Sequence, residues 1–382
     1  MTDVARPHRP PLPDAPVAVL FGGPSAEHDV SIVSGEAIAD ALDDAGVAVS
    51  RVLVDLDGSW WWLPPGHRRG DRPPAAYDDP AALGADGPLS VGAALDRLAA
   101  TTPPPIAFLA FHGPWGEDGT VQALVESIGL PYTGAGVLAS ALGMDKAIFK
   151  RLCRGLGLPV VDWREIGAGR WVRDPAAVLV ELEAFAQATG DERLMIKPAR
   201  LGSSVGMTLA HTPAERAPAL ERAFAFDTLV LVERYVAEAR ELEVAVIGND
   251  PAAIELYGPG EILSGHEFYD YEAKYSPGLS ETRPAAELPP ILREQIRKHA
   301  RDAYRAIGAE GFGRVDFLLG RDAVYISEIN TIPGFTPISL FPTLPAESGL
   351  DFAAVCLRVL ELAVERQAAR SRRRLRPAEL PR

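Results

Sequence analysis

Apolar and polar residues alternate along the first third of the chain in the way expected for strands followed by helices. Apolar runs typical of buried strands occupy residues 17–21, 51–55 and 106–111. Helical patterns follow at 26–42 and 120–129, the second after the glycine-rich loop HGPWGEDG. The stretch 60–88 is rich in Pro, Gly and Asp and is expected to be an irregular insertion. This alternation predicts a parallel, doubly wound α/β domain.

The rest of the chain predicts two α+β units. The central unit is expected to have helices at 137–156, 177–189 and 214–225 and strands at 158–163, 194–198 and 229–236. The C-terminal unit is expected to have strands at 241–248 and within 312–330, a polar loop at 258–289, a helix ending at 307 and an amphipathic helix at 350–370. The expected organisation is a disordered leader at 1–16, an N-terminal domain at 17–140, a central domain at 141–236, a C-terminal domain at 237–370 with a lid loop at 265–284, and a tail at 371–382.

Composition restricts the classes of function. The chain has 382 residues and a formal net charge of -14 at pH 7 with histidine neutral, which argues against non-specific nucleic-acid binding. Its two cysteines, Cys153 and Cys356, lie far apart inside apolar helical patterns, so neither a disulfide framework nor a metal knuckle is indicated. The proline-rich residues 1–16 lack the apolar region of a signal peptide, and no run of about 18 apolar residues occurs. We expect a cytoplasmic enzyme that binds neither membrane nor nucleic acid.

Two strand-like runs near the C-terminus carry candidate metal ligands. GRVDFLL and VYISEIN are separated by a short loop, which predicts a hairpin. In an antiparallel pair centred near Asp322, the partner of Asp316 is Glu328. The partner of Arg314 is then Asn330, and all four side chains meet on one face. Two carboxylates and an amide oxygen suit Mg²⁺ held together with substrate phosphates. A surface hairpin whose arginine pairs with the acids remains an alternative, and a slip of one residue would separate the groups.

A second candidate is a loop for phosphate groups. The segment GSSVG at 202–206 follows the apolar run LMIKP, and its backbone N–H groups can fold over phosphates while Lys197 supplies a cation. It matches neither the GxxxxGK[ST] loop nor the GxGxxG fingerprint, so P-loop and Rossmann interpretations lose support. By local pattern alone the loop could be an ordinary polar turn. Lys146, Glu233 and Glu241, each taken alone, could likewise be surface residues.

Six motifs taken together resemble one protein family. In chain order they are FGGPSAEHDVS, HGPWGEDGT, GMDKAIFKRL, KPARLGSSVG, EFYDYEAKY, and GRVDF followed by EINTIPGFTPISL. Their residues and order, over roughly 17–365, resemble the D-alanine–D-alanine ligase family. The resemblance implies an ATP-grasp fold of mixed α/β and α+β class, with a doubly wound N-terminal domain and two α+β domains that enclose ATP. It also implies that the N-terminal domain and a mobile loop enclose the amino-acid substrate.

The resemblance assigns nucleotide and metal roles. The residues implied to bind ATP are Lys146, Lys197, Ser204, Glu233, Tyr235, Val236 and Glu241. Asp316, Glu328 and Asn330 match the ligands of two Mg²⁺ ions, for which Mn²⁺ can substitute, and which bridge the ATP phosphates. The hairpin pattern and the resemblance therefore indicate the same three metal ligands.

The resemblance also assigns catalytic and substrate-binding roles. Glu27 matches the acid that binds the ammonium of the first D-alanine, and Ser203 and Tyr275 match the residues that link to it. Arg314 and the backbone N–H of Gly334 match the groups that stabilise an oxyanion. The residues implied to bind substrate are His112, Lys274, Ser339 and Leu340. Relatives that make D-alanyl-D-lactate depart from the run FYDYEAKY around Tyr275, so D-alanine is favoured as second substrate.

The implied activity is ATP-dependent joining of two D-alanine molecules through a D-alanyl phosphate, giving ADP and phosphate, for peptidoglycan synthesis. A homodimer is the family expectation. The alternatives are a D-alanyl-D-lactate or D-alanyl-D-serine ligase, a non-catalytic ATP-grasp nucleotide-binding protein, or another ATP-grasp enzyme such as a carboxylase component. The last would not share SAEHDVS and FYDYEAKY, and a non-catalytic protein should have lost a metal ligand, the oxyanion arginine or the lid.

Overall fold

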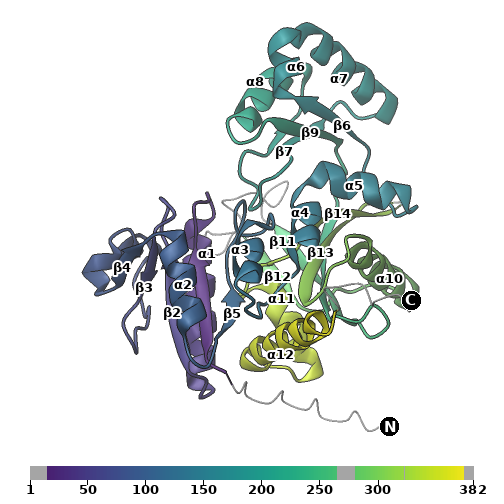
Figure 1. Cartoon of the computed structure of the whole chain (residues 1–382). Helices are drawn as coiled ribbons and strands as arrows, with labels where there is room; N and C mark the ends of the chain where they lie inside the picture. Colours follow the sequence, from purple (N-terminus) through teal and green to yellow (C-terminus); the bar gives the residue numbers. More distant parts are fainter. Residues whose placement is uncertain (1–14, 265–279, 322, 374–382) are drawn as a thin grey trace, which may run out of the picture.

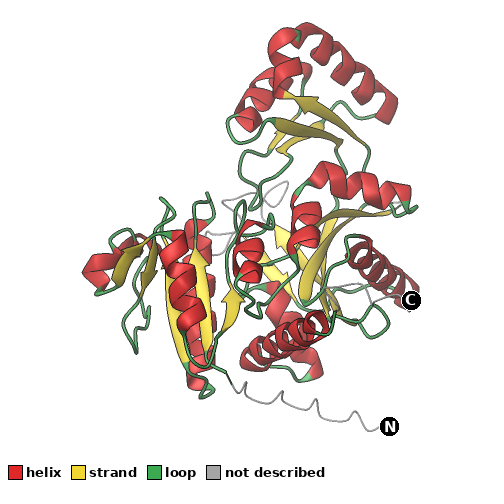
Figure 2. Ribbon diagram, in the orientation of Figure 1, coloured by secondary structure: helices red, strands yellow, loops and turns green. Residues whose placement is uncertain are grey.

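The fold contains three β-sheets with helices packed on them (Figure 1). The computed structural model describes residues 15–264, 280–321 and 323–373. A five-stranded, a four-stranded and a five-stranded sheet follow one another along the chain, and Figure 2 shows the middle one with its helices as a separate lobe. This is the mixed α/β and α+β architecture that the sequence predicts, while the domain boundaries stay predictions. Within the described ranges, no helix has the length and apolar character needed to cross a membrane.

The N-terminal sheet has a parallel centre and an antiparallel edge. Its strands, in the order β4-β3-β2-β1-β5, are β4 (Asp86–Leu89), β3 (Trp60–Trp62), β2 (Val49–Val54), β1 (Val17–Gly22) and β5 (Ile106–Leu109). Strands β2, β1 and β5 run parallel, as predicted, and α1 (His28–Asp44) packs on β1. Strands β3 and β4 extend the sheet antiparallel. The prediction of an irregular insertion over 60–88 is therefore wrong at both ends, because strands of three and four residues are too short to show alternation.

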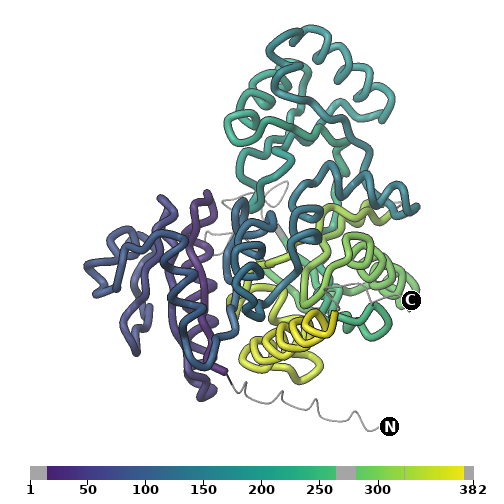
Figure 3. The backbone as a smooth tube through the Cα atoms, in the orientation of Figure 1, coloured from purple at the N-terminus to yellow at the C-terminus, as the bar shows by residue number. Residues whose placement is uncertain are grey.

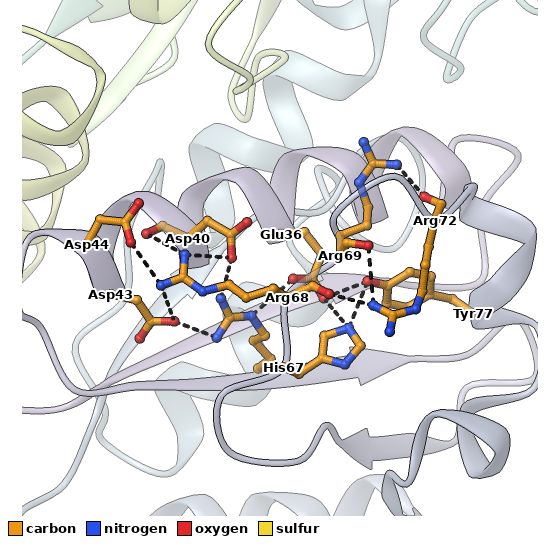
Figure 4. Close-up of polar contacts among 10 residues, drawn as sticks. Glu36, Asp40, Asp43, Asp44, His67, Arg68, Arg69, Arg72 and Tyr77 are labelled. Atoms are coloured by element: carbon orange, nitrogen blue, oxygen red, sulfur yellow. Dashed lines mark hydrogen bonds and ion pairs between the residues drawn. The ribbon is translucent and has the colours of Figure 1, made fainter.

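A buried polar network ties the segment between β3 and β4 to α1 (Figure 4). Tyr77, at the end of the short helix η1 (Pro74–Tyr77), donates to Glu36 Oε1 at 2.9 Å and lies 3.0 Å from His67 Nε2. Arg51 Nε donates to Glu36 Oε2 at 3.0 Å. Burial raises the pKa of Glu36 against the attraction of Arg51. Arg68 adds exposed ion pairs to the acidic residues of α1. The buried polar side chains that attach this segment to α1 therefore all have hydrogen-bond partners.

The central sheet has one apolar face and one face that mixes charged and apolar side chains. Its strands, in the order β6-β9-β7-β8, are β6 (Trp163–Gly167), β9 (Leu229–Arg234), β7 (Leu194–Pro198) and β8 (Thr208–Ala210), and all pairs are antiparallel. Ile196 and Val232 share a core with α7 (Pro175–Thr189) and α8 (Pro213–Phe224), and α6 (Ala168–Arg173) packs beside α7. Because side chains alternate along a strand, Lys197 and Glu233 point to the opposite face. That face is free to line a site.

The C-terminal sheet is entirely antiparallel. Its strands, in the order β12-β11-β10-β13-β14, are β12 (Ser280–Arg283), β11 (Glu255–Ser264), β10 (Arg240–Ile247), β13 (Phe312–Leu319) and β14 (Val324–Asn330). Phe149 of α5 (Lys146–Gly155) and Ile296 of α10 (Pro290–Ala306) share a core with Val315. A second core joins Phe21 of β1 to Leu360 of α12 (Phe352–Ser371). The N-terminal and C-terminal sheets therefore share one core with α12, whose trace is drawn in yellow in Figure 3.

Three predicted elements differ from the structure. The helix predicted at 137–156 divides into α4 (Val137–Met144) and α5, because Asp145 is extended and its side chain caps α5 by accepting from Ile148 N at 3.0 Å. The strand predicted at 158–163 begins only at Trp163. The loop predicted at 258–289 contains most of β11 and all of β12. Strand β11 was not predicted because it contains Gly258, Pro259 and Gly260, a composition that is typical of a turn.

Candidate active site

A pocket formed by the central and C-terminal sheets collects the residues predicted to bind ATP. Its lining includes Lys146, Lys197, Ser204, Glu233, Tyr235, Val236, Glu241, Arg314, Asp316 and Glu328. All seven residues predicted to bind ATP are present, with two of the three predicted metal ligands. The third, Asn330, donates from Nδ2 to Asp316 Oδ2 at 2.9 Å. The fold therefore brings together side chains that lie far apart in the sequence, although their roles stay predictions.

Glu233, near the end of β9, is a buried carboxylate with a cation on each oxygen. Lys150 Nζ lies 2.6 Å from Oε1 and Lys197 Nζ lies 2.9 Å from Oε2. Burial raises the pKa of Glu233, but the charges of both lysines and their hydrogen bonds outweigh burial and bring the pKa to about 2. Glu233 is therefore ionised at neutral pH and can only accept hydrogen bonds.

The β13–β14 hairpin has the predicted register where it meets the pocket. Arg314 lies opposite Asn330, and Asp316 lies opposite Glu328. The ladder is not regular, however, because Ser327 forms a β-bulge and the pairs on the turn side are shifted by one residue. If the pairing of the turn side continued, Asp316 would lie opposite Ser327 and Glu328 would face the core. The bulge therefore places both carboxylates on one face.

Cations compensate the carboxylates of this hairpin. Arg314 donates from Nε and Nη2 to the two oxygens of Asp316, each at 2.7 Å, and its Nε lies 3.2 Å from Glu243 Oε2. Lys146 Nζ lies 3.0 Å from Glu328 Oε2. Burial alone lowers the pKa of Arg314, but the surrounding carboxylates raise it above its usual value. Arg314 is therefore fixed in place as a charged, half-buried group beside three carboxylates.

The donor set of the hairpin fits Mg²⁺. Asp316 and Glu328 offer carboxylate oxygens and Asn330 offers an amide oxygen, all of them hard ligands. Among residues 15–264, 280–321 and 323–373, no group of three or more His, Cys, Asp or Glu side chains is arranged to hold a metal ion. Two carboxylates and one amide would leave coordination positions for water and phosphate oxygens, and the assignment of these residues as metal ligands stays a prediction.

The loop at 202–206 approaches Glu27 of the N-terminal domain. Ser203 and Ser204 have left-handed φ angles of 48° and 56°, a succession in which neighbouring backbone N–H groups can form an anion-binding nest. The Ser203 hydroxyl donates to Glu27 Oε1. A Cβ atom at Gly202 would lie 2.8 Å from Glu27 Oε2, so a larger residue here would push the Glu27 carboxylate aside. The loop thus connects the nucleotide pocket to Glu27.

Glu117 anchors the loop that carries Gly334. Its Oε1 accepts from Ile332 N at 3.0 Å and its Oε2 accepts from Gly113 N at 2.9 Å. Burial and the nearby charge of Glu27 raise the pKa of Glu117 to about 8. A single side chain of the N-terminal domain therefore holds two backbone loops, one from each end of the chain.

His112 holds the same loop through its carbonyl group. His112 Nδ1 lies 3.1 Å from Ile332 O, which can only accept, so Nδ1 carries the proton. The other ring nitrogen, Nε2, lies 2.9 Å from Ser34 Oγ and accepts its proton. Burial lowers the pKa of His112 to about 4, so the ring is neutral. Its predicted contact with substrate stays a prediction, since both ring nitrogens have protein partners here.

Ser339 and Leu340 follow Gly334 on the same loop. A Cβ atom at Gly334 would lie 3.4 Å from Ser339 Oγ, which places the serine hydroxyl beside the predicted oxyanion donor. Ser339 Oγ also lies 2.7 Å from Thr336 Oγ1 and accepts from Thr336 N at 3.1 Å. Leu340 opens α11 (Leu340–Thr343) and is buried in the core shared by the two outer sheets. Leu340 therefore anchors the loop.

Comparison with known protein families agrees with this geometry. Residues 16–135 match the model described as the D-ala D-ala ligase N-terminus, and residues 152–361 match the D-ala D-ala ligase C-terminus. The chain belongs to the D-alanine–D-alanine ligase family. It is therefore an ATP-dependent ligase with the ATP-grasp fold.

Members of the ligase family resemble the chain over almost its whole length. It is 39% identical over 368 residues to a D-alanine–D-alanine ligase of Chlorobaculum tepidum, with 92% of this chain and 97% of the relative covered. It is 38% identical over 367 residues to that of Heliobacterium modesticaldum, with 93% and 96% covered. Among solved structures, the Coxiella burnetii D-alanine-D-alanine ligase has a TM-score of 0.72 at 29% identity, with 94% and 97% covered. The VanG D-Ala:D-Ser ligase of Enterococcus faecalis has a TM-score of 0.77 at 28% identity, with 92% and 100% covered.

Two residues of the predicted ligase site lie outside the described residues. These are Lys274 and Tyr275, in the predicted lid at 265–284. The described residues therefore include the nucleotide pocket, the β13–β14 hairpin and the Gly334 loop. The roles of Lys274 and Tyr275 stay predictions.

Three buried charged residues of the ligase site were missed by the sequence analysis. Lys150 has a recognisable signal, because it follows Lys146 by four residues on the apolar face of α5. Glu117 and Glu243 carry no such signal. A loop acid and an acid in a strand are usually exposed, and only the fold reveals the partners that allow their burial.

Proposed function

We propose that this ligase joins two D-alanine molecules into D-alanyl-D-alanine for peptidoglycan synthesis, converting ATP into ADP and phosphate. The contact between Ser203 and Glu27 carries the proposal. Ser203 belongs to the loop beside the nucleotide pocket, and Glu27 is a buried carboxylate suited to an amino-acid ammonium group. Their contact supports an amino-acid site at Glu27 that lies next to a phosphate site at the loop.

ATP is proposed to lie along the pocket with its base at residues 233–236 and its ribose near Glu241. The carboxylate of the first D-alanine attacks the γ-phosphorus, the bond to ADP breaks, and D-alanyl phosphate forms. Lys146 and Lys197 line the pocket and offset the negative charge of the phosphate groups. Glu27 holds the ammonium of the first D-alanine, which positions its carboxylate for the attack.

The second step forms the peptide bond. The amine of the second D-alanine attacks the carbonyl carbon of D-alanyl phosphate, and the tetrahedral intermediate expels phosphate. Arg314 and the N–H of Gly334 stabilise the oxyanion, and one such donor contributes about 3 kcal/mol. Ser339, next to Gly334, receives the carboxylate of the second D-alanine. The anchoring of the Gly334 loop by Glu117 keeps these donors in place.

We propose that Asp316, Glu328 and Asn330 hold two Mg²⁺ ions, with Mn²⁺ able to substitute. When bound, the ions supply positive charge to the phosphate oxygens during transfer. Replacing Glu328 by Gln removes a ligand charge and should abolish ATP-dependent product formation. The matched control is Glu294→Gln on the exposed face of α10, which should keep wild-type turnover. Normal turnover of Glu328→Gln would contradict the metal assignment.

The choice of second substrate is tested by product analysis. The purified protein is given ATP, D-alanine and, separately, D-lactate or D-serine, and products are separated by mass. We expect D-alanyl-D-alanine as the main product, with phosphate release that requires both ATP and D-alanine. D-Serine is the second candidate, because the VanG D-Ala:D-Ser ligase shares the fold at a TM-score of 0.77. Exclusive use of D-serine or D-lactate would overturn the choice of D-alanine.

We also propose a cytoplasmic homodimer, in line with the family expectation. Light scattering after size-exclusion chromatography should give twice the chain mass of 40.9 kDa. A mass equal to one chain at all protein concentrations would contradict the dimer.

A further inference from the structure

Lys150 is a buried cation directly behind the nucleotide pocket. It lies on α5 and has no exposed surface, and its Nζ is 2.6 Å from Glu233 Oε1. Glu233 is part of the pocket lining, whereas Lys150 is not. Lys150 thus contacts the pocket through Glu233.

The position of Lys150 is unfavourable for a cation considered by itself. Burial lowers the pKa of Lys150 against the attraction of Glu233, and the Trp163 ring, with its centroid 5.2 Å from Nζ, offsets part of this cost through a cation–π contact. Replacing Lys150 and Glu233 together by apolar residues would avoid the cost of removing two charges from water, whereas removing Lys150 alone would leave Glu233 buried with one cation fewer. Contact between α5 and β9 therefore does not by itself require a lysine, and the charge must act on Glu233.

Glu233 has a second cation, but that cation has another predicted task. Lys197 Nζ lies 2.9 Å from Glu233 Oε2 and also lines the pocket, where it is proposed to contact the phosphates of ATP. A bound phosphate would compete with Glu233 for Lys197. Lys150 has no access to the pocket, so its charge remains with Glu233 in the loaded enzyme.

An ionised carboxylate accepts hydrogen bonds and donates none. At the end of a nucleotide pocket, it favours a base edge that presents an amino group and disfavours one that presents a carbonyl oxygen. We propose that Lys150 is a positioning residue that keeps Glu233 an acceptor-only group, and so sets the preference of the site for a 6-amino purine. The inference rests on the proposed placement of the ATP base against residues 233–236.

The test compares the dissociation constants of ATP and purine riboside 5′-triphosphate, measured by calorimetry. The analogue has hydrogen in place of the 6-amino group and keeps the rest of the base, so the ratio reports the hydrogen bond to Glu233. The wild-type protein should bind ATP on the order of tenfold more tightly, as expected for a hydrogen bond to a charged acceptor. Lys150→Met should bring the ratio close to one, while Lys150→Arg should retain most of it.

Lys298→Met on α10 is the matched control. Its side chain is exposed and forms an ion pair with Asp302 on the surface of the same helix, at 2.7 Å, so the wild-type ratio is expected. If Lys150→Met does not fold, Lys150→Gln removes the charge while keeping a polar group, and the ratio should again fall. An unchanged ratio in the folded neutral variant, or a ratio of one in the wild-type protein, would overturn the inference. Absence of D-alanyl-D-alanine in the product assay would instead refute the proposed function, since binding is measured without it.

Discussion

The raised pKa of Glu117 predicts that its contribution to the free energy of unfolding falls as pH rises. Its pKa is raised to about 8 by burial and by the charge of Glu27, from an ordinary value of 4.5. Below pH 4.5 the carboxyl group is protonated in both the folded and the unfolded chain, and its contribution to stability is complete. Between 4.5 and about 8 the unfolded chain ionises while the folded chain stays protonated, so the contribution is progressively lost as pH rises.

The magnitude of this loss follows from the two pKa values. Their separation corresponds to about 5 kcal/mol, at about 1.4 kcal/mol for each pH unit. Glu117→Gln resembles the protonated residue but stays neutral at every pH. It places an amide N–H₂ against one of the two backbone donors, Gly113 N or Ile332 N, which costs about 1–3 kcal/mol. The variant should therefore be less stable than the wild-type protein at pH 5 and more stable at pH 9.

The assay is thermal unfolding of both proteins at pH values from 5 to 9. The midpoint difference between variant and wild type cancels other titrating groups, and it should change sign across the series by several degrees. The control is Glu221→Gln on α8, which makes the same substitution at an exposed position. A midpoint difference for Glu117→Gln that does not vary with pH would refute the raised pKa.

The remaining predictions concern the N-terminal domain and are read by thermal unfolding. Tyr77→Phe removes the hydroxyl that donates to Glu36 Oε1 and should cost about 1–3 kcal/mol, so an unchanged midpoint would contradict the network. Gly35→Ala should strongly destabilise the fold, because the new Cβ would lie 2.4 Å from Phe21 Cβ and Cγ and would force α1 away from β1. Its matched control is Gly92→Ala in α2 (Val91–Ala100), where no atom lies within 4 Å, and a small gain in stability is expected.

The hairpin shows how much of a site a local pattern can predict. The pairing of Asp316 with Glu328 and of Arg314 with Asn330 is confirmed. The regular ladder assumed for it is wrong, because the turn side follows a different register. The signal was present in the sequence: the polar pair Ser327 and Glu328 interrupts the alternation of VYISEIN. A local phase change of this kind predicts a bulge when the flanking residues belong to one core.

Long-range contacts account for what the sequence did not reveal. The position of Lys150 on the apolar face of α5 indicates burial, but its partner Glu233 lies on β9, 83 residues further along the chain. Nothing in the local sequence around Glu117 indicates burial, and its hydrogen-bond partner Ile332 N lies in the C-terminal domain. A charged side chain is usually buried only when it has a partner, and a partner so far away in the sequence is not predictable from a single sequence. The sequence motifs predicted the residues that line the pocket, whereas the contacts of Lys150 and Glu117, which lie outside the lining, are found only in the structure.

The bulge at Ser327 also limits edge-to-edge aggregation through strand β14. Strand β14 is the last strand of its sheet, and a regular edge offers unpaired N–H and C=O groups to a second chain. A chain lacking Ser327 would keep the same partners on β13 and would present a flatter edge. With Ser327 in place, the edge is locally twisted, and Ile326 N is already occupied by Pro159 O at 2.8 Å. The residue that aims Glu328 at the pocket thus also makes the edge a poor template for aggregation.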